Sequence, residues 1–318
     1  MKCFYHTDVD GKCAGAIVKK WWNSVYRAMQ DGITGDCAEF FSIDYKDEFP
    51  FDKILPNEQV IIVDFSLQKE GEFEKLRQIT EDIIWIDHHK TAIEKHPTMV
   101  DLKGKRDVSK AGCELTWEYF FPDKEMPLAV KYAGRYDVWD FSQFGEILNE
   151  FQAGIRLEEH YPQSPIWEEL FKKSYKPSID ESVKLASEGT KISIKPNGEI
   201  EGLDSVLEII LKEGKIALKF RTNNYASLIK AFSFFTEFEG YKAICCNVGA
   251  TSSQLFDSVK EDYDLMIPFV FDGKQWTVSL YTKKDIDCSE IAKKYGGGGH
   301  KQAAGFQCKT LPFIIGAK

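Results

Sequence analysis

The chain has 318 residues, of which 43% are hydrophobic and 29% charged, a composition typical of a globular protein rather than a disordered or fibrous one. This length predicts two domains, and no apolar run approaches the ~18 residues that a membrane span requires. The formal net charge of −9 argues against binding of long nucleic acid, which needs an extended basic surface.

The first half of the sequence alternates between strand-like and helix-like segments. Apolar strands are expected at residues 2–5, 39–43, 60–63 and 83–86. Helices are expected at residues 14–22, 69–80, 111–121 and from residue 127 to about residue 136, and Ser109 is the expected N-cap of the third helix. Strands that alternate with helices predict a mostly parallel sheet with helices on both faces.

A second, smaller α/β region is expected towards the C-terminus. Proline and glycine residues interrupt the pattern through residues 179–215, which we interpret as a connector. Strands are expected at residues 242–247, 267–271 and 275–280, followed by a helix at 288–295 that begins after Asp287 and ends at Gly296. We therefore predict an α/β protein with domains at residues 1–178 and 216–318.

Eight cysteines are scattered along the chain, and no two of them have Cys-x-x-Cys spacing. This spacing excludes a zinc knuckle and a thioredoxin motif, so we expect buried free thiols in a reducing compartment. The first residues lack the basic and then apolar stretch of a secretory signal. A cytoplasmic location is therefore expected.

Three of the predicted strands run directly into acidic and histidine residues. Residues 6–11 read HTDVDG, Asp64 follows the strand at 60–63, and residues 87–89 read DHH after the strand at 83–86. Because the carboxyl ends of parallel strands meet at one edge of a sheet, we expect these side chains to lie together. Each motif alone also fits a helix cap or a turn, but their occurrence at three strand ends favours a metal site.

Carboxylates and imidazoles without thiolates select hard to intermediate divalent cations. Mn²⁺ or Mg²⁺ fits this donor set, with Fe²⁺ and Co²⁺ as alternatives. The number of ligands is enough for two ions that share a bridging carboxylate, a pair that would activate a water molecule for attack on phosphorus. The candidate ligands are His6, Asp8, Asp10, Asp64, His88 and one further acidic residue.

The adjacent histidines of the DHH motif are expected to have different roles. In an extended segment their side chains point to opposite sides, so we assign His88 to the metal and His89 to the substrate phosphate or to transition-state charge. Asp87 is expected to orient one of them. His96 and His160 have no neighbouring ligands in the sequence and are expected at the surface.

Together with residues 136–139 (YDVW), these motifs resemble the four motifs of the DHH phosphoesterases. Residues 296–306 (GGGGHKQAAGF) are similar to the signature of the associated DHHA1 domain. The resemblance implies two metal ions, often Mn²⁺, in a cleft between a DHH and a DHHA1 domain. It adds Asp137 to the metal ligands and makes Asp64 the bridging one, whereas Asp140 is expected at the surface. The implied catalytic residues are Asp64, Asp87, His88 and His89.

The glycine run also has a functional interpretation. Successive glycines allow backbone N–H groups to approach an anion closely. Relatives commonly carry an arginine where this chain has Tyr281, so either Arg221 replaces it or the substrate is held more by stacking. The substrate-binding residues are therefore expected to be Gly297, Gly298, Gly299, His300 and Arg221.

The resemblance implies metal-assisted hydrolysis of a phosphoester. After two domains and a connector the chain has no room for a further strand-tracking domain, which favours short oligonucleotides or linear dinucleotides, cleaved to mononucleotides as by nano-RNases. The alternatives are a phosphatase or exopolyphosphatase acting on 3′-phosphoadenosine 5′-phosphate or polyphosphate, a cyclic-dinucleotide phosphodiesterase, and a non-catalytic nucleotide-binding module. No long duplex and no membrane is expected as a partner, and a homodimer is left open.

Overall fold

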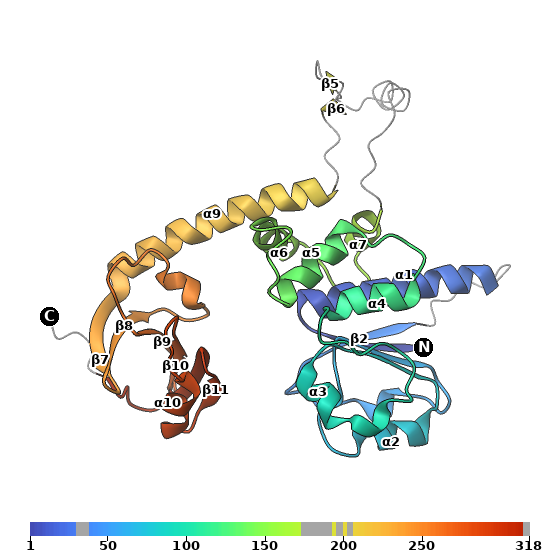
Figure 1. Ribbon diagram of the computed structural model, residues 1–318, viewed down its shortest axis with the longest axis horizontal. Coiled ribbons are helices and arrows are strands. Elements are labelled where there is room, and N and C mark those ends of the chain that lie inside the picture. The colour runs from blue at the N-terminus through green and yellow to red at the C-terminus, as the bar shows by residue number, and fades with distance from the viewer. Residues whose placement is uncertain (30–37, 173–192, 195–199, 202–205, 314–318) are drawn as a thin grey trace. The chain divides into compact units, whose positions relative to one another are not determined.

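The computed structural model describes residues 1–29, 38–172, 193–194, 200–201 and 206–313 (Figure 1). It divides into two units, Met1–Ala217 and Leu218–Lys318. The division falls inside one helix, α9 (Val206–Phe232), which begins within the predicted connector and continues past its end. Most of the remaining connector lies outside the described residues. No described helix is both long and apolar enough to cross a membrane.

The first unit contains a four-stranded sheet in which all neighbouring strands are parallel. Strand β1 lies inside the sheet, so both of its edges are hydrogen-bonded and its carboxyl end lies between two other strand ends. The four predicted strands are confirmed to within one residue. In spatial order they are β2 (Glu39–Ile43), β1 (Lys2–His6), β3 (Val60–Val63) and β4 (Ile83–Ile86).

Helices cover both faces of this sheet, as predicted (Figure 1). The alternation of side chains along β3 explains why, since Ile61 and Val63 enter one core whereas Val60 and Ile62 enter the other. The first core is covered by α1 (Val9–Met29), α4 (Gly112–Phe120), α5 (Leu128–Asp137), α6 (Ile147–Ile155) and α7 (Ile166–Leu170). The second core is covered by α2 (Glu72–Ile79), beside which lies the short helix α3 (Lys90–Lys95).

One predicted helix start and one predicted N-cap are wrong. Helix α1 begins at Val9, before Gly11, because a glycine without a Cβ can pack against the His6 carbonyl; a Cβ at Gly11 would lie 2.3 Å from that oxygen. Helix α4 has Ala111 as its N-cap, not Ser109. Ser109 instead donates its hydroxyl and its backbone N–H to Asp107, which forms a turn before the helix.

The prediction that His96 lies at the surface is also wrong. His96 is buried, and its Nε2–H donates to the Leu67 carbonyl at 2.8 Å. Its ring packs edge-on against Phe73 and Trp85. An imidazole can be buried when one nitrogen finds a carbonyl, so the lack of nearby metal ligands in the sequence did not imply exposure.

The second unit contains a six-stranded mixed sheet in the order β11-β12-β10-β9-β8-β7. Only the β8–β9 pair is parallel among these strands, and the predicted α/β character of this region is confirmed. Apolar side chains of α10 pack on one face, and those of α9 pack on the other. Its elements are β7 (Ser233–Phe238), β8 (Tyr241–Asn247), β9 (Leu265–Phe271), β10 (Trp276–Tyr281), α10 (Cys288–Lys294), β11 (Gly298–His300) and β12 (Ala303–Cys308).

Candidate metal centre

The carboxyl edge of the parallel sheet brings the predicted acids and histidines together. His6 is the last residue of β1, and Asp8 and Asp10 lie where the chain turns into α1. Asp64 directly follows β3, and His88 follows β4 by two residues. These side chains come from positions about 80 residues apart, and the parallel register places them at one end of the sheet.

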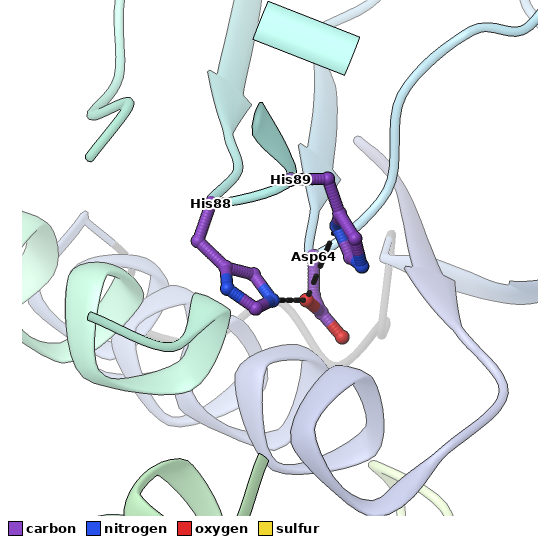
Figure 2. Close-up of side chains that lie close together, drawn as sticks. All are labelled: Asp64, His88 and His89. Atoms are coloured by element: carbon purple, nitrogen blue, oxygen red, sulfur yellow. Dashed lines mark ion pairs between the residues drawn. The ribbon is translucent and has the colours of Figure 1, made fainter. Parts of the chain in front are cut away.

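Asp64 lies at the centre of this cluster. Its Oδ1 is 3.2 Å from Nε2 of His88 and 4.0 Å from Nδ1 of His89, as Figure 2 shows. Its Oδ2 is 3.8 Å from Nδ1 of His6. The two oxygens of one carboxylate therefore face different histidines, which is the arrangement that a carboxylate bridging two cations requires.

The surroundings of Asp64 are unfavourable for a carboxylate without a cation. The residue is 1% exposed, and neither oxygen has a hydrogen-bond partner among the described residues. Burial, followed by the charges of Asp10, Asp8 and Asp137, raises the pKa of Asp64 well above its ordinary value. Its backbone is also left-handed, with φ of 53°, a conformation that costs a non-glycine residue free energy and is often retained at functional sites.

Asp10 is held from the opposite side by the start of α4. Its two carboxylate oxygens accept backbone N–H groups from Gly112 at 2.8 Å and Cys113 at 3.0 Å. The N-terminus of a helix carries partial positive charge, which attracts the Asp10 carboxylate. Asp10 Oδ2 also lies 3.8 Å from Nε2 of His88.

The adjacent histidines are not arranged as predicted. Both lie beside Asp64 rather than on opposite sides of the chain (Figure 2), and their ring centroids are 4.4 Å apart. Strand β4 ends at Ile86, and the carboxylate of Asp87 holds the residues that follow it. Asp87 Oδ1 accepts the backbone N–H of His88 at 2.8 Å and Nδ1–H of His89 at 2.8 Å.

Asp137, rather than Asp140, reaches this cluster. Asp137 Oδ2 lies 3.3 Å from Nε2 of His88, whereas Asp140 forms an ion pair with Arg135 at 3.3 Å. Burial and then the charges of Asp10 and Asp8 raise the pKa of Asp137 to about 8. By contrast, the pKa of Asp8 is lowered, because its hydrogen bond to His6 at 2.9 Å and the His6 charge outweigh the effect of burial.

The donor set fits divalent cations. Three overlapping groups each offer ligand atoms within 4.8 Å of one another: His6, Asp8 and Asp64; Asp64, His88 and His89; and Asp10, His88 and Asp137. All donors are imidazole nitrogens or carboxylate oxygens, which suit Mn²⁺ and Mg²⁺. The unpartnered Asp64 oxygens and the unpartnered Nε2 of His88 point to coordinated cations.

The raised pKa values predict that the metal-free protein loses stability as the pH rises. In the native protein Asp137 has a pKa of about 8, whereas in the unfolded chain an aspartate has a pKa of about 4. Between these two pH values the native state therefore binds more protons than the unfolded state. We expect the free energy of unfolding in EDTA to fall by at least about 1 kcal/mol between pH 6.5 and 8.5, a decrease in Tm of roughly 2–4 °C. Thermal unfolding with EDTA and with anaerobic Mn²⁺ measures this, and Mn²⁺ should abolish the loss. A stability in EDTA that is constant or rises over this range would contradict it.

The sequence interpretation missed two aromatic residues near these ligands. Tyr45, two residues after β2, is 39% exposed, stacks on Phe65, and its ring lies 5.0 Å from that of His6 and 5.7 Å from that of His89. Tyr45 could have been predicted from the sequence, because it follows a fourth parallel strand, β2, whose carboxyl end lies at the same edge of the sheet. Trp139, two residues after Asp137, is 68% exposed and has a left-handed backbone with φ of 58°.

The predicted substrate-binding residues all lie in the second unit. The glycine run follows α10, and its Gly297 donates an N–H to the Ala292 carbonyl of that helix. The run then continues as β11, which pairs with β12. This pairing places Gly298 and Gly299 in a hairpin rather than in an open loop. His300 is exposed and lines a pocket of about 460 Å³ with Lys283, Lys284 and Lys301. Arg221 lies in α9, and no described contact joins it to His300.

Family models match both parts of the chain. The DHH family, N-terminal domain, matches residues 3–135, and the DHHA1 domain matches residues 249–314. The chain therefore carries the N-terminal domain of the DHH family, whose members are phosphoesterases, and a DHHA1 domain. The resemblance inferred from the motifs is confirmed, whereas the nano-RNase type is not established by these matches.

Individual relatives are distant. The chain is 26% identical over 278 residues to an uncharacterised protein, R106, of Acanthamoeba polyphaga mimivirus, a match that covers 83% of this chain and 55% of the relative. The chain thus spans about half the length of the curated relative it matches.

Two solved structures of low sequence identity resemble the chain. The DHH domain of a protein described as a member of the s1p family of ribosomal proteins is 14% identical, with a TM-score of 0.55 over 98% of this chain and 82% of that chain. Exonuclease RecJ bound to manganese is 14% identical, with a TM-score of 0.47 over 96% and 85% of the two chains. The first of these supports the fold alone.

Proposed function

We propose that this protein is a metal-dependent phosphodiesterase that hydrolyses short oligonucleotides or linear dinucleotides to mononucleotides. The observation that carries the proposal is the Asp64 carboxylate, buried without a partner among the described residues and facing histidines on both sides. A phosphodiester carries negative charge, and an isolated cluster of carboxylates would repel it. Cations held by this cluster reverse the local charge.

The ligands divide between two cations that share Asp64. His6 and Asp8 belong to one, and Asp10, His88 and Asp137 belong to the other, in agreement with two of the groups that the geometry defines. Mn²⁺ is the favoured ion and Mg²⁺ or Co²⁺ are alternatives. Such a pair, when bound, polarises phosphoryl oxygens and makes water a stronger nucleophile at neutral pH.

His89 is suited to a role at the substrate. Its Nδ1–H is held by Asp87, which leaves Nε2 free to contact a phosphoryl oxygen. Burial lowers the pKa of His89, but the hydrogen bond and charge of Asp87 outweigh that effect and raise it overall. A protonated His89 would stabilise negative charge that develops on the phosphoryl group, and Asp87 would fix the ring in position.

The domain roles follow from the placement of these residues. Residues 1–178 hold the metal ligands and would carry the reaction, and residues 216–318 would bind the substrate through His300, Arg221 and Gly297 to Gly299. Three lysines line that pocket beside His300, and each of them pairs with an aspartate. The short substrate is favoured because the net charge of −9 provides no extended basic surface for a long strand.

Trp139 provides the test that separates a nucleotide substrate from polyphosphate. Its exposed ring can stack on a base, a contact of about 1–3 kcal/mol. We expect Trp139→Ala to raise KM for a linear dinucleotide by roughly 5- to 100-fold. Turnover of tripolyphosphate, which has no base, should not change.

The measurement compares both substrates with Mn²⁺ in the wild type, Trp139→Ala and Trp139→Phe. Trp139→Phe should recover most of the affinity for the dinucleotide, because its ring also stacks. Equal losses on both substrates would make Trp139 structural. Preferential hydrolysis of tripolyphosphate, 3′-phosphoadenosine 5′-phosphate or a cyclic dinucleotide by the wild type would replace the proposed substrate.

A further inference from the structure

The first unit contains a second pocket of about 310 Å³ whose lining does not include the metal ligands. It lies between α1, α7 and the residues that follow α4, and we call it the α1–α7 pocket. Four lysines and one acid, Glu168, supply its charge, which is therefore positive. The lysines are Lys19, Lys20, Lys124 and Lys172.

The positive charge of the α1–α7 pocket is only partly balanced among the described residues. Lys172 pairs with Glu169 at 2.6 Å, and Lys19 donates to the Gln163 carbonyl at 3.0 Å. Lys124 lies 4.9 Å from the ring of Phe121, and Lys20 has no ion pair among the described residues. By contrast, each lysine of the pocket around His300 pairs with an aspartate.

The walls of this pocket strengthen its attraction for an anion. Trp167, Phe171 and Phe121 line it and are almost entirely buried, and Lys19 and Lys20 are half-buried beside them, whereas Lys124 and Lys172 are exposed. Burial, followed by repulsion from Lys124, lowers the pKa of Lys20. A bound anion would relieve this repulsion.

The α1–α7 pocket lies along the helix that begins at the metal centre. Lys20 is ten residues after Asp10 on α1, a separation of about 15 Å at the rise of an α-helix. Lys12 and Lys19 are seven residues apart and so lie on the same face of α1. Lys12 donates to Nε2 of His160 at 3.3 Å, and Lys12 lies on α1 between Asp10 and the residues that line the pocket.

We infer that the α1–α7 pocket binds a phosphate group of a nucleotide or short oligonucleotide. The phosphate has two potential sources, the distal end of an oligonucleotide that is being cleaved or a free mononucleotide. The first source rests on the proposed function, because it requires an oligonucleotide substrate. Phosphate binding itself does not, because it needs neither the cations nor hydrolysis.

Binding is measured in EDTA, where neither cation is present, with a 5′-fluorescein trinucleotide that carries a 3′-phosphate. The double variant Lys20→Ala/Lys124→Ala should bind at least roughly tenfold more weakly than the wild type, with a smaller salt dependence because fewer phosphate contacts remain. The control Lys69→Ala/Lys103→Ala removes two exposed lysines elsewhere in the same unit and should bind like the wild type. Equal affinities of the double variant and the control would overturn the inference.

Two further measurements identify the source of the phosphate. If the distal end of the substrate occupies the pocket, the double variant should have a raised KM for a tetranucleotide and an unchanged KM for a dinucleotide. If a free nucleotide occupies it, AMP should displace the probe from the wild type in EDTA while both KM values stay unchanged. A protein that hydrolyses no nucleotide would refute the proposed function but leave the binding result standing.

Discussion

Replacing Asp64 by asparagine should reduce turnover of a dinucleotide at least roughly 10³-fold and, at the same time, stabilise the metal-free protein. Activity falls because the carboxylate that faces histidines on both sides is lost. Stability rises by about 1–3 kcal/mol because a buried, unpartnered carboxylate among other carboxylates is replaced by a neutral amide. The measurements are kcat with Mn²⁺, metal content by elemental analysis, and urea unfolding in EDTA.

Asp140→Asn is the matched control for this prediction. It makes the same chemical change close to the cluster, but Asp140 is bound to Arg135 and Ser142 and does not reach His88. Its turnover should stay within about twofold of the wild type. Asp64→Asn activity within tenfold of the wild type, or a loss of stability in EDTA, would contradict the bridging role of Asp64.

Replacing Gly112 by alanine should lower turnover by about 10- to 100-fold without removing any ligand. A Cβ at this position would lie 2.6 Å from Oδ1 of Asp64 and 2.6 Å from its Cβ. Either Asp64 or the start of α4 must move, and α4 also holds Asp10 through the backbone N–H of Gly112. The overpacking should cost about 1–3 kcal/mol of stability.

Gly71→Ala separates the loss of activity from a general loss of stability. Gly71 has a left-handed backbone with φ of 79° and no atom within 4 Å of an added Cβ, so alanine there costs about 1–2 kcal/mol through the backbone alone. Its kcat should equal that of the wild type. If Gly71→Ala and Gly112→Ala lose activity in proportion to their stability, the close approach of Gly112 to Asp64 has no specific role.

The sequence was sufficient to predict the cluster because a single geometric rule applies to it. His6, Asp64 and His88 each follow an apolar segment, and parallel strands must bring such positions to one edge. The orientation of His89 could not be predicted in this way, because it depends on how Asp87 closes a turn through its own carboxylate. The N-cap of α4 was wrongly predicted for a similar reason, since the Ser109 hydroxyl donates to Asp107.

Other features depend on tertiary contacts that have no local pattern. The burial of His96 depends on one carbonyl, that of Leu67, 29 residues earlier in the chain. The role of Gly112 depends on its distance from Asp64. The lysines of the α1–α7 pocket come from positions 19 to 172, and in the sequence each resembles an ordinary solvated lysine.

Asp10 differs from the other ligands in how much a substitution there would disturb. Its carboxylate accepts two backbone N–H groups at the start of α4 and also faces His88. The side chain that would hold a cation therefore also supports the fold. Chance mutation at position 10 would therefore penalise folding and chemistry together, whereas a change at Asp137 would spare the fold. Among related proteins that no longer hydrolyse a substrate, we would therefore expect the aspartate at the position of Asp10 to persist longer than the one at the position of Asp137.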